Sequence, residues 1–513
     1  QTQQNRGLSM NKPLFMGIDI GTYESKGVLV DAQANVLAFH ACPHLLETPK
    51  PGYAEHDPLG DWWADFKKIV KELLEKSGVK AEEIAGIGIS TVMAGITPVD
   101  ENCNPLRNAI LYGIDSRAQK QAEDLKREIG EDVMMEKCGA IVDNESFGPK
   151  IRWIHDNEPD IFARAKHFTI ASGFLTAKLT GEYYVDKYSA SAALPMYDTR
   201  NYCWRKELTP YVCREDQLPK VAKTTDVIGY VTKAAAQETG LAEGTPVIAG
   251  TTDAGAEAES VGVVEPGDMM LMYGSTMFIV YLTENVCENV GLSATPYTID
   301  GNYALIAGMA TTGSLTRWIR DQFGRDLMEK EAAGGESAYA ALAREASAIP
   351  AGSDGLIVLP YFLGERMPLK DPNAKGVIFG LNLRHTRGHI MKAAYEGMGY
   401  GLDQNLSMLR NAGLKLDNVT SVGGGTKAPE WLQTISDVCG IRQTVPEVTI
   451  GASYGDAMLA GIGIGAMTTA DIKNAVKARY VTEPDMAKHA QYEPMKKHFA
   501  ELYKRNVDIM HAL

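Results

Sequence analysis

A glycine-containing segment after an apolar run carries the first residues that could handle a phosphate. Residues 17–26 read GIDIGTYESK. Gly21 allows a sharp backbone turn next to a phosphate, and Asp19, at the end of the predicted strand, could hold a metal-bound water. Thr22 offers a hydroxyl and an N–H group, and Lys26 offers a positive charge to a phosphoryl group in transfer. An ordinary hairpin with polar turn residues has the same pattern, so this segment alone does not decide between the two.

A second segment places an aspartate directly after another apolar run. Residues 250–255 read GTTDAG. Asp253 could act as a general base that takes a proton from a hydroxyl attacking a phosphorus atom. Aspartate is also a common N-cap of helices. Taken alone, this segment favours the cap.

A third segment combines three consecutive glycines with a helix start. Residues 422–431 read VGGGTKAPEW, and Pro429 suits the first turn of a helix. A glycine turn between a strand and a helix presents backbone groups to a flat or anionic ligand. A tight connection needs fewer than three glycines, so the pattern favours close approach of a ligand.

Several phosphate-handling classes are excluded by what the sequence lacks. The dipeptide Gly-Lys does not occur, which excludes a Walker A loop. Neither His-Arg-Asp nor Asp-Phe-Gly occurs, which excludes a protein kinase.

The elements that must position these residues alternate between strands and amphipathic helices. Apolar runs predict strands over 14–20, 27–31, 84–90, 246–250 and 269–273, and the spacing of apolar residues predicts a helix over 58–76 capped by Asp57. This alternation indicates an α/β protein. A strand–turn–strand pattern over 16–30 recurs over 269–282, where the turn is Gly274-Ser275-Thr276. The two hairpins could grip a polyphosphate from both sides, or they could be unrelated.

Composition restricts the partners and the compartment. The chain has 513 residues, a net charge of −14 and 50 glycines, many of them beside Asp, Ser or Thr at strand ends. An acidic chain is unsuited to coating nucleic acid, although backbone N–H groups and a metal can still hold a phosphate. The seven scattered cysteines and the lack of a long apolar run predict a cytoplasmic protein with no membrane partner. Residues 1–9 read as a vector-derived tail.

These three segments, in this order, resemble the FGGY family of carbohydrate kinases. Two further stretches match the family signatures, FGPKIRW over 147–153 and GVIFGL over 376–381, the latter followed by HIMKAAYE over 389–396. The stretches LPYFLGERMP over 359–368 and GYAEHD over 52–57 are similar to the xylulokinase branch. The similarity runs from about Phe15 to about Gly465.

The resemblance implies an actin-like, ribonuclease-H-like ATPase fold with two domains, over 10–260 and 261–513, and an interdomain cleft. It implies ATP-dependent phosphorylation of a small carbohydrate hydroxyl, most like a xylulokinase, with Mg²⁺. In this family context Asp253 becomes the catalytic base, and Asp19 helps to place the metal. The positions that match nucleotide-binding motifs are Thr22, Tyr23, Lys26, Gly274, Ser275, Thr276, Gly313, Arg317, Gly424 and Gly425. Family members are often dimers, which makes a homodimer one option.

The sugar-binding segments depart from the xylulokinase pattern. Val92-Met93-Ala94-Gly95 stands where Gln-Met-His-Gly is typical, and residues 113–117 keep only Asp115 and Arg117 of Trp-Asn-Asp-x-Arg. A site built for hydroxyls discriminates through its buried polar groups, so the acceptor is a ketopentose, another ketose, a polyol or a sugar acid. Asp115 and Arg117 either bind the acceptor or form a surface ion pair. A non-catalytic actin-like ATP-binding protein is the alternative from a different class.

Overall fold

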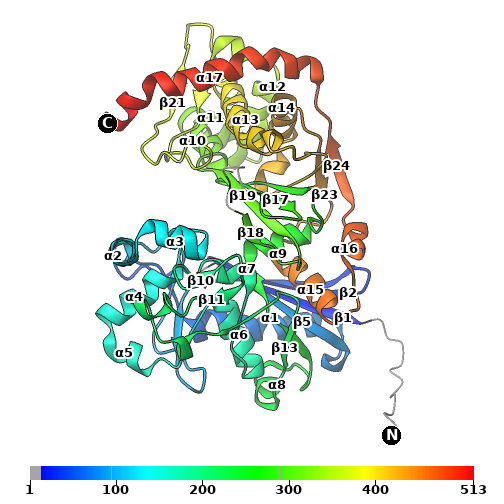
Figure 1. The fold of residues 1–513 in the computed structure, drawn as a ribbon. Helices are drawn as coiled ribbons and strands as arrows, with labels where there is room; N and C mark the ends of the chain where they lie inside the picture. Colours follow the sequence, from blue (N-terminus) through cyan, green and yellow to red (C-terminus); the bar gives the residue numbers. More distant parts are fainter. Residues whose placement is uncertain (1–12, 94, 288–291, 293) are drawn as a thin grey trace. The chain divides into compact units, whose positions relative to one another are not determined.

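The computed structural model describes residues 13–93, 95–287, 292 and 294–513, which fold into two compact units (Figure 1). The main division falls between Val264 and Glu265, whereas the sequence suggested residue 260. Thr295–Asn302 and Ile450–Ala475 also belong to the first unit, so two segments of the C-terminal half complete the N-terminal one. The expected tail over 1–9 lies outside the described residues.

The first unit is built on a mixed sheet with the strand order β13-β14-β5-β1-β2-β3. Strand β1 pairs in parallel with β5 and antiparallel with β2, while β3 continues the antiparallel side and β13 pairs antiparallel with β14. The bounds are β1 Leu14–Ile20, β2 Glu24–Asp31, β3 Val36–Pro43, β5 Ile84–Thr91, β13 Val227–Tyr230 and β14 Pro246–Ile248.

The second unit repeats this pairing scheme. Its strands have the order β19-β17-β16-β22-β23-β24, in which β16 pairs antiparallel with β17 and in parallel with β22. Their bounds are β16 Asp268–Tyr273, β17 Met277–Thr283, β19 Tyr303–Met309, β22 Asn418–Val422, β23 Gln443–Pro446 and β24 Ala478–Thr482. The hairpin β1-β2 therefore corresponds to β16-β17, which explains the repeat seen in the sequence.

Helix α15, Ala452–Gly463, lies in the C-terminal half of the sequence but packs in the first unit and holds its elements together. It packs on β1, β2, β5 and on α9, Asp253–Ser260; in Figure 1 the orange helix lies beside the blue strands. Glycines make this approach possible. A Cβ atom added to Gly88 would lie 2.1 Å from the Asp456 carbonyl oxygen, and one on Gly455 would lie 1.9 Å from that of Ala256.

The remaining helices divide between the two units. Those of the first unit are α1 Ala64–Ser77, α2 Gln119–Ile129, α3 Glu131–Cys138, α4 Phe147–Asn157, α5 Pro159–Arg164, α6 Ala171–Thr180, α7 Lys187–Ala190, α8 Lys233–Thr239 and α16 Thr469–Ala475. Those of the second unit are α10 Gly313–Phe323, α11 Arg325–Ala332, α12 Ala338–Ser347, α13 Arg387–Asn411, α14 Pro429–Cys439 and α17 Met486–Ala512. None of the helices in the described ranges is both long and apolar enough to cross a membrane.

The helix predicted over 58–76 is interrupted near its start. The structure has a π-helical turn η1, Pro58–Trp63, followed by α1. Asp57 caps this turn as expected, because its Oδ1 accepts a hydrogen bond from the Leu59 N–H at 2.9 Å. The apolar stripe predicted for this segment is buried in the core of the first unit, where Trp62, Phe66, Ile69 and Val70 are fully shielded from solvent.

Candidate active site

Four carboxylic acids from three elements gather in the first unit. Asp19 is the second-last residue of β1, Asp253 begins α9, Glu257 lies one helical turn later, and Asp456 projects from α15. Burial is the main cause that raises the pKa of each of these acids, and neighbouring acids raise it further for Asp19, Glu257 and Asp456. The cluster therefore holds more negative charge than its surroundings stabilise, and it is suited to cationic or proton-donating ligands.

Asp253 has the properties of a general base and not of a helix cap. The N-cap position of α9 is Thr252, whereas Asp253 is the first helical residue. Its Oδ1 accepts a hydrogen bond from the next residue, Ala254, at 2.7 Å, and no other donor to it is found among the described residues. The interpretation of Asp253 as an N-cap is therefore wrong. Burial raises the pKa of Asp253 to about 6, so the carboxylate is ionised at neutral pH and still basic enough to take a proton.

Asp19 shares a serine with Asp456. The Ser90 hydroxyl, on β5, donates to Asp456 Oδ2 at 2.6 Å and lies 3.4 Å from Asp19 Oδ1. Burial, Asp253 and Glu257 raise the pKa of Asp19 well above its usual range, while Lys26 acts in the opposite direction. Among the residues that the structure describes, the buried Oδ1 of Asp456 meets no hydrogen-bond partner.

The carboxylates near Asp19 suit Mg²⁺ better than a metal ion that is coordinated by protein side chains alone. Within the part of the chain that the structure describes, no three His, Cys, Asp or Glu side chains are placed to hold a metal together. Mg²⁺ prefers oxygen ligands and usually takes one or two carboxylates, completing its shell with waters and phosphate oxygens. Asp19, with excess negative charge around it, fits such a role.

The turn between β1 and β2 presents unpaired backbone N–H groups. Its register ends at the pair Ile20 and Ser25, and the Gly21 N–H donates to the Glu24 carbonyl at 3.0 Å. Among the described residues, no acceptor faces the N–H groups of Thr22 and Tyr23. Adjacent N–H groups of this kind form an anion-binding concavity. The Thr22 hydroxyl is hydrogen-bonded to the hydroxyl of Tyr112 at 3.1 Å.

The corresponding turn of the second unit is tied to the start of α10. The N–H of Gly313 donates to the Gly274 carbonyl at 2.9 Å, and that of Ser314 donates to the Ser275 carbonyl at 3.2 Å. A Cβ atom on Gly313 would lie 2.4 Å from the Gly274 oxygen, so glycine is required there. Arg317, one turn further along α10, is exposed, and no acidic partner is found for it among the described residues. The structure thus joins Gly274, Ser275 and Gly313 in one local feature.

Residues 423–425 are three consecutive glycines. The local structure explains why glycine stands at positions 423 and 425, but not why it stands at position 424. Gly423 has a φ of 92°, and a Cβ atom on Gly425 would lie 2.6 Å from the Trp431 ring and 2.7 Å from the Tyr273 Cβ. A Cβ atom on Gly424 would meet no described atom within 4 Å. The open side of Gly424 is consistent with the approach of a ligand.

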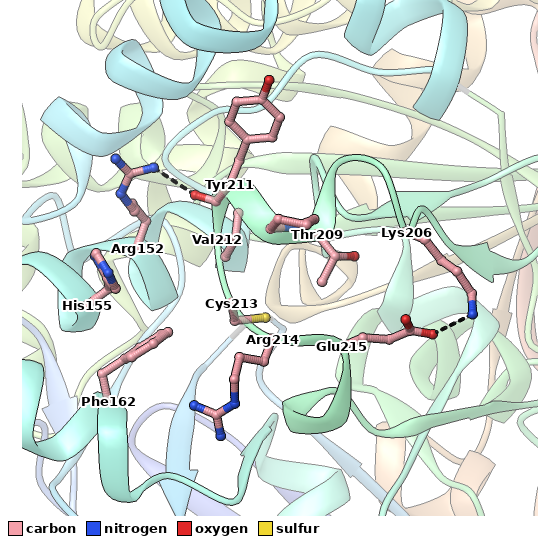
Figure 2. A pocket seen from close by; sticks show the side chains of 11 residues that line it. Arg152, His155, Phe162, Lys206, Thr209, Tyr211, Val212, Cys213, Arg214 and Glu215 are labelled. Carbon is pink, nitrogen blue, oxygen red and sulfur yellow. Dashed lines mark hydrogen bonds and ion pairs between the residues drawn. The ribbon is translucent and has the colours of Figure 1, made fainter.

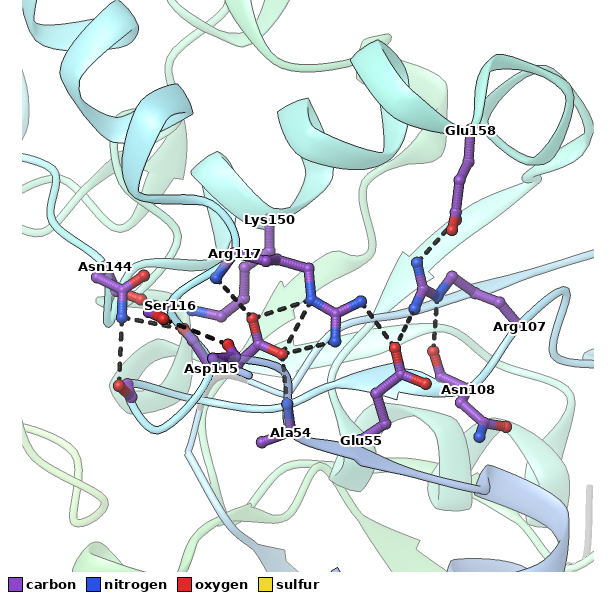
Figure 3. A network of polar contacts seen from close by, with 12 residues as sticks. Ala54, Glu55, Arg107, Asn108, Asp115, Ser116, Arg117, Asn144, Lys150 and Glu158 are labelled. Atoms are coloured by element: carbon purple, nitrogen blue, oxygen red, sulfur yellow. Dashed lines mark hydrogen bonds and ion pairs between the residues drawn. The ribbon is translucent and has the colours of Figure 1, made fainter. Parts of the chain in front are cut away.

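Asp115 and Arg117 are buried and bind each other (Figure 3). Both side chains are almost fully shielded from solvent, at 0% and 1% exposure, so the alternative of a surface ion pair is wrong. Asp115 accepts from Arg117 Nε at 2.9 Å and from the Ala54 N–H at 2.7 Å. Arg117 also pairs with Glu55 at 2.7 Å and lies 3.9 Å above the Tyr53 ring. Direct contact of this pair with an acceptor stays a prediction, as does that of Met93; Ala94 lies outside the described residues.

The turn between β1 and β2, over residues 21–23, is called the phosphate turn below, after the role that we propose for it. A hollow of about 760 Å³ opens beside this turn. Lys50 is the only charged residue in its lining, which consists of Thr22, Tyr23, Leu46, Thr48, Pro49, Lys50, Pro51, Gly52, Tyr53, Ala54, Tyr112 and Ile114. Burial raises the pKa of Tyr112, and the negative charge of Asp253 adds to the effect. Tyr112 thus connects this hollow electrostatically with the candidate base.

Another hollow, of about 530 Å³, carries charges that already have partners (Figure 2). Arg152 pairs with Glu128 and donates to the Tyr211 carbonyl, while Lys206 pairs with Glu215. It contains none of the residues that the sequence singled out for chemistry. The candidate active site is therefore the acidic cluster with the neighbouring turn.

Sequence reasoning missed Glu257, Asp456 and Ser90. Glu257 follows Asp253 by four residues, a spacing that places both on one face of a helix, so it could have been found. Asp456 is the one charged residue of the helical sequence ASYGDAMLAGIG, which is a weaker signal. Ser90 carries no signal, because only the parallel pairing of β5 with β1 places it opposite Asp19.

Comparisons with known proteins agree with this geometry. Residues 14–258 match the N-terminal domain and residues 269–464 the C-terminal domain of the FGGY family of carbohydrate kinases. A xylulose kinase of Staphylococcus epidermidis is 28% identical over 501 residues, covering 97% of each chain. A gluconokinase of Bacillus subtilis is 27% identical, covering 89% of this chain and 88% of its own. The crystal structure of a xylulose kinase from Rhodospirillum rubrum superposes with a TM-score of 0.89 at 29% identity, covering 97% of this chain and all of the other.

Proposed function

Because the chain belongs to the FGGY family of carbohydrate kinases, with an actin-like two-domain α/β fold and ATP as phosphoryl donor, we propose that it phosphorylates a hydroxyl of a ketopentose such as xylulose. The observation that carries this proposal is the position of Asp253, a half-buried acid with a pKa of about 6 beside Asp19. Xylulose kinases among the relatives that align over almost the whole chain support the choice of acceptor.

In the proposed reaction Asp253 accepts the proton of the acceptor hydroxyl as its oxygen attacks the γ-phosphorus of ATP. The N–H groups of Thr22 and Tyr23, with the Lys26 ammonium, bind oxygens of the transferring phosphate. Asp19 would hold Mg²⁺, for which oxygen ligands are preferred. When bound, the ion would neutralise charge on the β- and γ-phosphates.

The candidate nucleotide-binding residues of the second unit offer groups of a similar kind. Gly274, Ser275 and Thr276 offer backbone and hydroxyl groups, and Arg317, one turn into the helix that starts at Gly313, offers a cation that has no acidic partner within the described part of the chain. Gly424 and Gly425 contribute the surface on which the adenosine rests.

A sugar acid is the second candidate acceptor. The hollow beside Tyr112 has one charged lining residue, the cationic Lys50, and no acid. A carboxylate at the far end of an aldonate would be attracted there. The likeness to gluconokinases supports this alternative. Asp115 and Arg117, with Met93 and Ala94, would shape the acceptor end of the site.

A coupled assay of ADP release over pentuloses, hexuloses, polyols and aldonates tests the proposal. We expect xylulose to give the highest kcat/KM, and a preference for gluconate would select the second candidate. If no acceptor raises ADP release above the background hydrolysis of ATP, the chain is an ATP-binding protein without kinase activity. Asp253→Asn is the matched control, because it should lose acceptor-dependent release while still binding ATP.

We further propose that the protein acts in the cytoplasm, as a homodimer, without nucleic-acid or membrane partners. The net charge of −14 supports the absence of a nucleic-acid partner. Light scattering coupled to gel filtration tests the oligomeric state, and a mass of 55.7 kDa would identify a monomer.

A further inference from the structure

Two histidines lie beneath the phosphate turn of the first unit, and each faces one of its carbonyl groups. His44, after β3, places Nε2 3.1 Å from the Gly21 carbonyl oxygen, and His56, in strand β4 (Glu55–His56), places Nε2 3.1 Å from that of Thr22. The rings meet edge to face with centroids 4.9 Å apart. Both side chains are buried, at 5% exposure for His44 and 0% for His56.

The neighbours of His56 fix its tautomer. The indole N–H of Trp62 can only donate, and it donates to His56 Nδ1 at 3.0 Å. Nδ1 is therefore unprotonated, Nε2 carries the hydrogen, and Nε2 donates to the Thr22 carbonyl. Burial, with the charge of His44, lowers the pKa of His56 to about 4, in agreement with a neutral ring.

The neighbours of His44 require a proton on both ring nitrogens. Nε2 faces a carbonyl oxygen, which only accepts, so Nε2 must donate. Nδ1 lies 2.9 Å from Asp65 Oδ2. The Ser25 hydroxyl donates its hydrogen to the same oxygen at 2.7 Å, so it has no hydrogen left to donate to Nδ1. With Asp65 ionised, Nδ1 must donate as well. His44 is therefore an imidazolium bound to a carboxylate.

Holding these two carbonyls sets the direction of two N–H groups. In a planar trans peptide the N–H points away from the preceding C=O. His44 and His56 bind the carbonyls of Gly21 and Thr22 on one side of the turn, so the N–H groups of Thr22 and Tyr23 point to the other. These are the N–H groups that have no acceptor within the described residues.

We propose that His44, as an imidazolium held by Asp65, is a positioning residue that aims the Thr22 and Tyr23 N–H groups at a nucleotide phosphate, with neutral His56 as its uncharged counterpart. This inference rests on the proposed function, because it takes the turn to be a phosphate site. Donation by a cation also polarises the Gly21–Thr22 peptide, which strengthens its N–H as a donor to an anion.

The groups that face His44 come from four elements. They are Asp65 on α1, Asp61 on η1, Ser25 on β2 and His56 on β4. Burial opposes the charge on His44, but the hydrogen bond and the charge of Asp65, helped by Asp61, outweigh it and raise its pKa. A raised histidine pKa means that the charge is present below that pKa and is lost as the pH rises through it. Phosphate binding should therefore weaken on the alkaline side.

The test compares His44→Gln with His155→Gln. His155 is a matched control, because it also contacts an aspartate, Asp156 at 2.8 Å, but is exposed and outside the proposed site. In His44→Gln we expect the KM for ATP and the Kd of a non-hydrolysable ATP analogue to rise about tenfold, a change typical of losing one charge-assisted hydrogen bond. The kcat should change far less, and the rise of KM at alkaline pH that we expect for the parent should be absent from the variant. His155→Gln should behave like the parent.

Long-range ¹H–¹⁵N NMR of the histidine rings tests the charge state without any activity. Both nitrogens of His44 should be protonated at neutral pH, whereas His56 should be protonated at Nε2 alone. A neutral His44 there would overturn the proposal, as would a folded His44→Gln variant with unchanged nucleotide affinity. If that variant does not fold, Asp65→Asn should raise the Kd of the analogue and lower the pH at which His44 loses its proton; no change in either would also overturn the proposal.

Failure of the proposed function gives a different pattern. If the parent protein binds the nucleotide but phosphorylates no acceptor, the kinase proposal fails while the effect of His44→Gln on nucleotide affinity still decides the inference. If the parent binds no nucleotide, both fail.

Discussion

At the scale of residues, the basicity of Asp253 results from its surroundings more than from its type. Within the described part of the chain, the Asp253 side chain has one hydrogen-bond donor, the adjacent Ala254 N–H, and burial raises its pKa to about 6. A surface aspartate near pKa 4 would be a poor base. Asp19 and Asp456 share the same region, yet Ser90 donates to Asp456 and leaves Asp253 without this stabilisation.

Replacement of Asp253 by Asn should remove proton transfer while leaving the fold intact. The amide is close to isosteric, so we expect kcat to fall about 10³-fold, within the range of general-base catalysis. The Kd for ATP should stay within a few-fold of the parent value. Single-turnover kinetics with the preferred acceptor measures the rate of phosphoryl transfer, and titration calorimetry measures the Kd for ATP. A variant that keeps a tenth of the parent kcat would contradict the assignment of Asp253 as the base.

The kcat/KM for the acceptor should decrease at acidic pH because Asp253 becomes protonated. A carboxyl whose pKa is raised to about 6 is protonated below that pH and cannot accept a proton. The kcat/KM for the acceptor should therefore fall as the pH drops through about 6 and reach a plateau above it. Stopped assays in constant-ionic-strength buffers check this, and a plateau extending unchanged down to the usual pKa of aspartate would show that Asp253 is not the base.

Gly424 and Gly425 should respond differently to an added side chain. Gly424 has open space where a Cβ would lie, whereas a Cβ on Gly425 would collide with Trp431 and Tyr273. We expect Gly424→Val to raise the KM for ATP about tenfold with unchanged thermal stability, as for a side chain that only blocks a ligand. Gly425→Ala should instead lower the melting temperature. Equal nucleotide affinity of Gly424→Val and the parent would argue against an adenosine site there.

At the scale of elements, α15 determines where the acids lie. It packs on β1 and β5, which carry Asp19 and Ser90, and on α9, which carries Asp253 and Glu257. The backbone contacts leave no room for a methyl group at Gly17, Gly88 or Gly455. A small shift of this one helix would therefore move Asp456 relative to the other three acids.

A pair of glycines on one strand tests this packing. Gly88 and Gly86 lie two residues apart on β5 and both face α15, but a Cβ on Gly88 would lie 2.1 Å from the Asp456 oxygen and one on Gly86 no closer than 3.4 Å to any atom. Gly88→Ala should lose about 2–3 kcal/mol of unfolding free energy, a typical cost of overpacking. Gly86→Ala should lose under about 1 kcal/mol. Urea unfolding measures the free energy of unfolding of both variants. Equal losses in the two variants would contradict the close contact of Gly88 with the Asp456 carbonyl.

At the scale of the whole molecule, the first unit depends on residues from the C-terminal half. Ile450–Ala475 returns to it and brings α15, which covers one face of β1 and β5. The core of the first unit is therefore incomplete in any fragment that stops before residue 450.

A fragment experiment follows from this connectivity. Residues 13–264 expressed alone should lack fixed tertiary structure, because the apolar face beneath α15 stays exposed to water. Co-expression with residues 265–513 should restore a folded complex. Near-ultraviolet circular dichroism and urea unfolding measure both states; a cooperative transition of the isolated fragment at parent stability would show that α15 is dispensable.

Local sequence patterns are sufficient to predict the class of chemistry and the local elements. Strand-end glycines beside Asp19 and Asp253, the repeated hairpin and Pro429 at a helix start are local patterns, and local patterns are set by backbone geometry and hydrophobic periodicity. The family model and the sheets confirm the α/β fold and its duplicated order. The sequence also placed Asp57 correctly as a cap.

Which distant residues act together depends on how the chain packs in three dimensions. Asp456 lies more than 400 residues from Asp19, and no periodicity links a helix near residue 456 to a strand near residue 19. The burial that raises the pKa of Asp253, the internal pairing of Asp115 with Arg117 and the two histidines under the phosphate turn also depend on long-range packing. Charge state and hydrogen-bond direction follow from the neighbours in space, and the sequence does not record these neighbours.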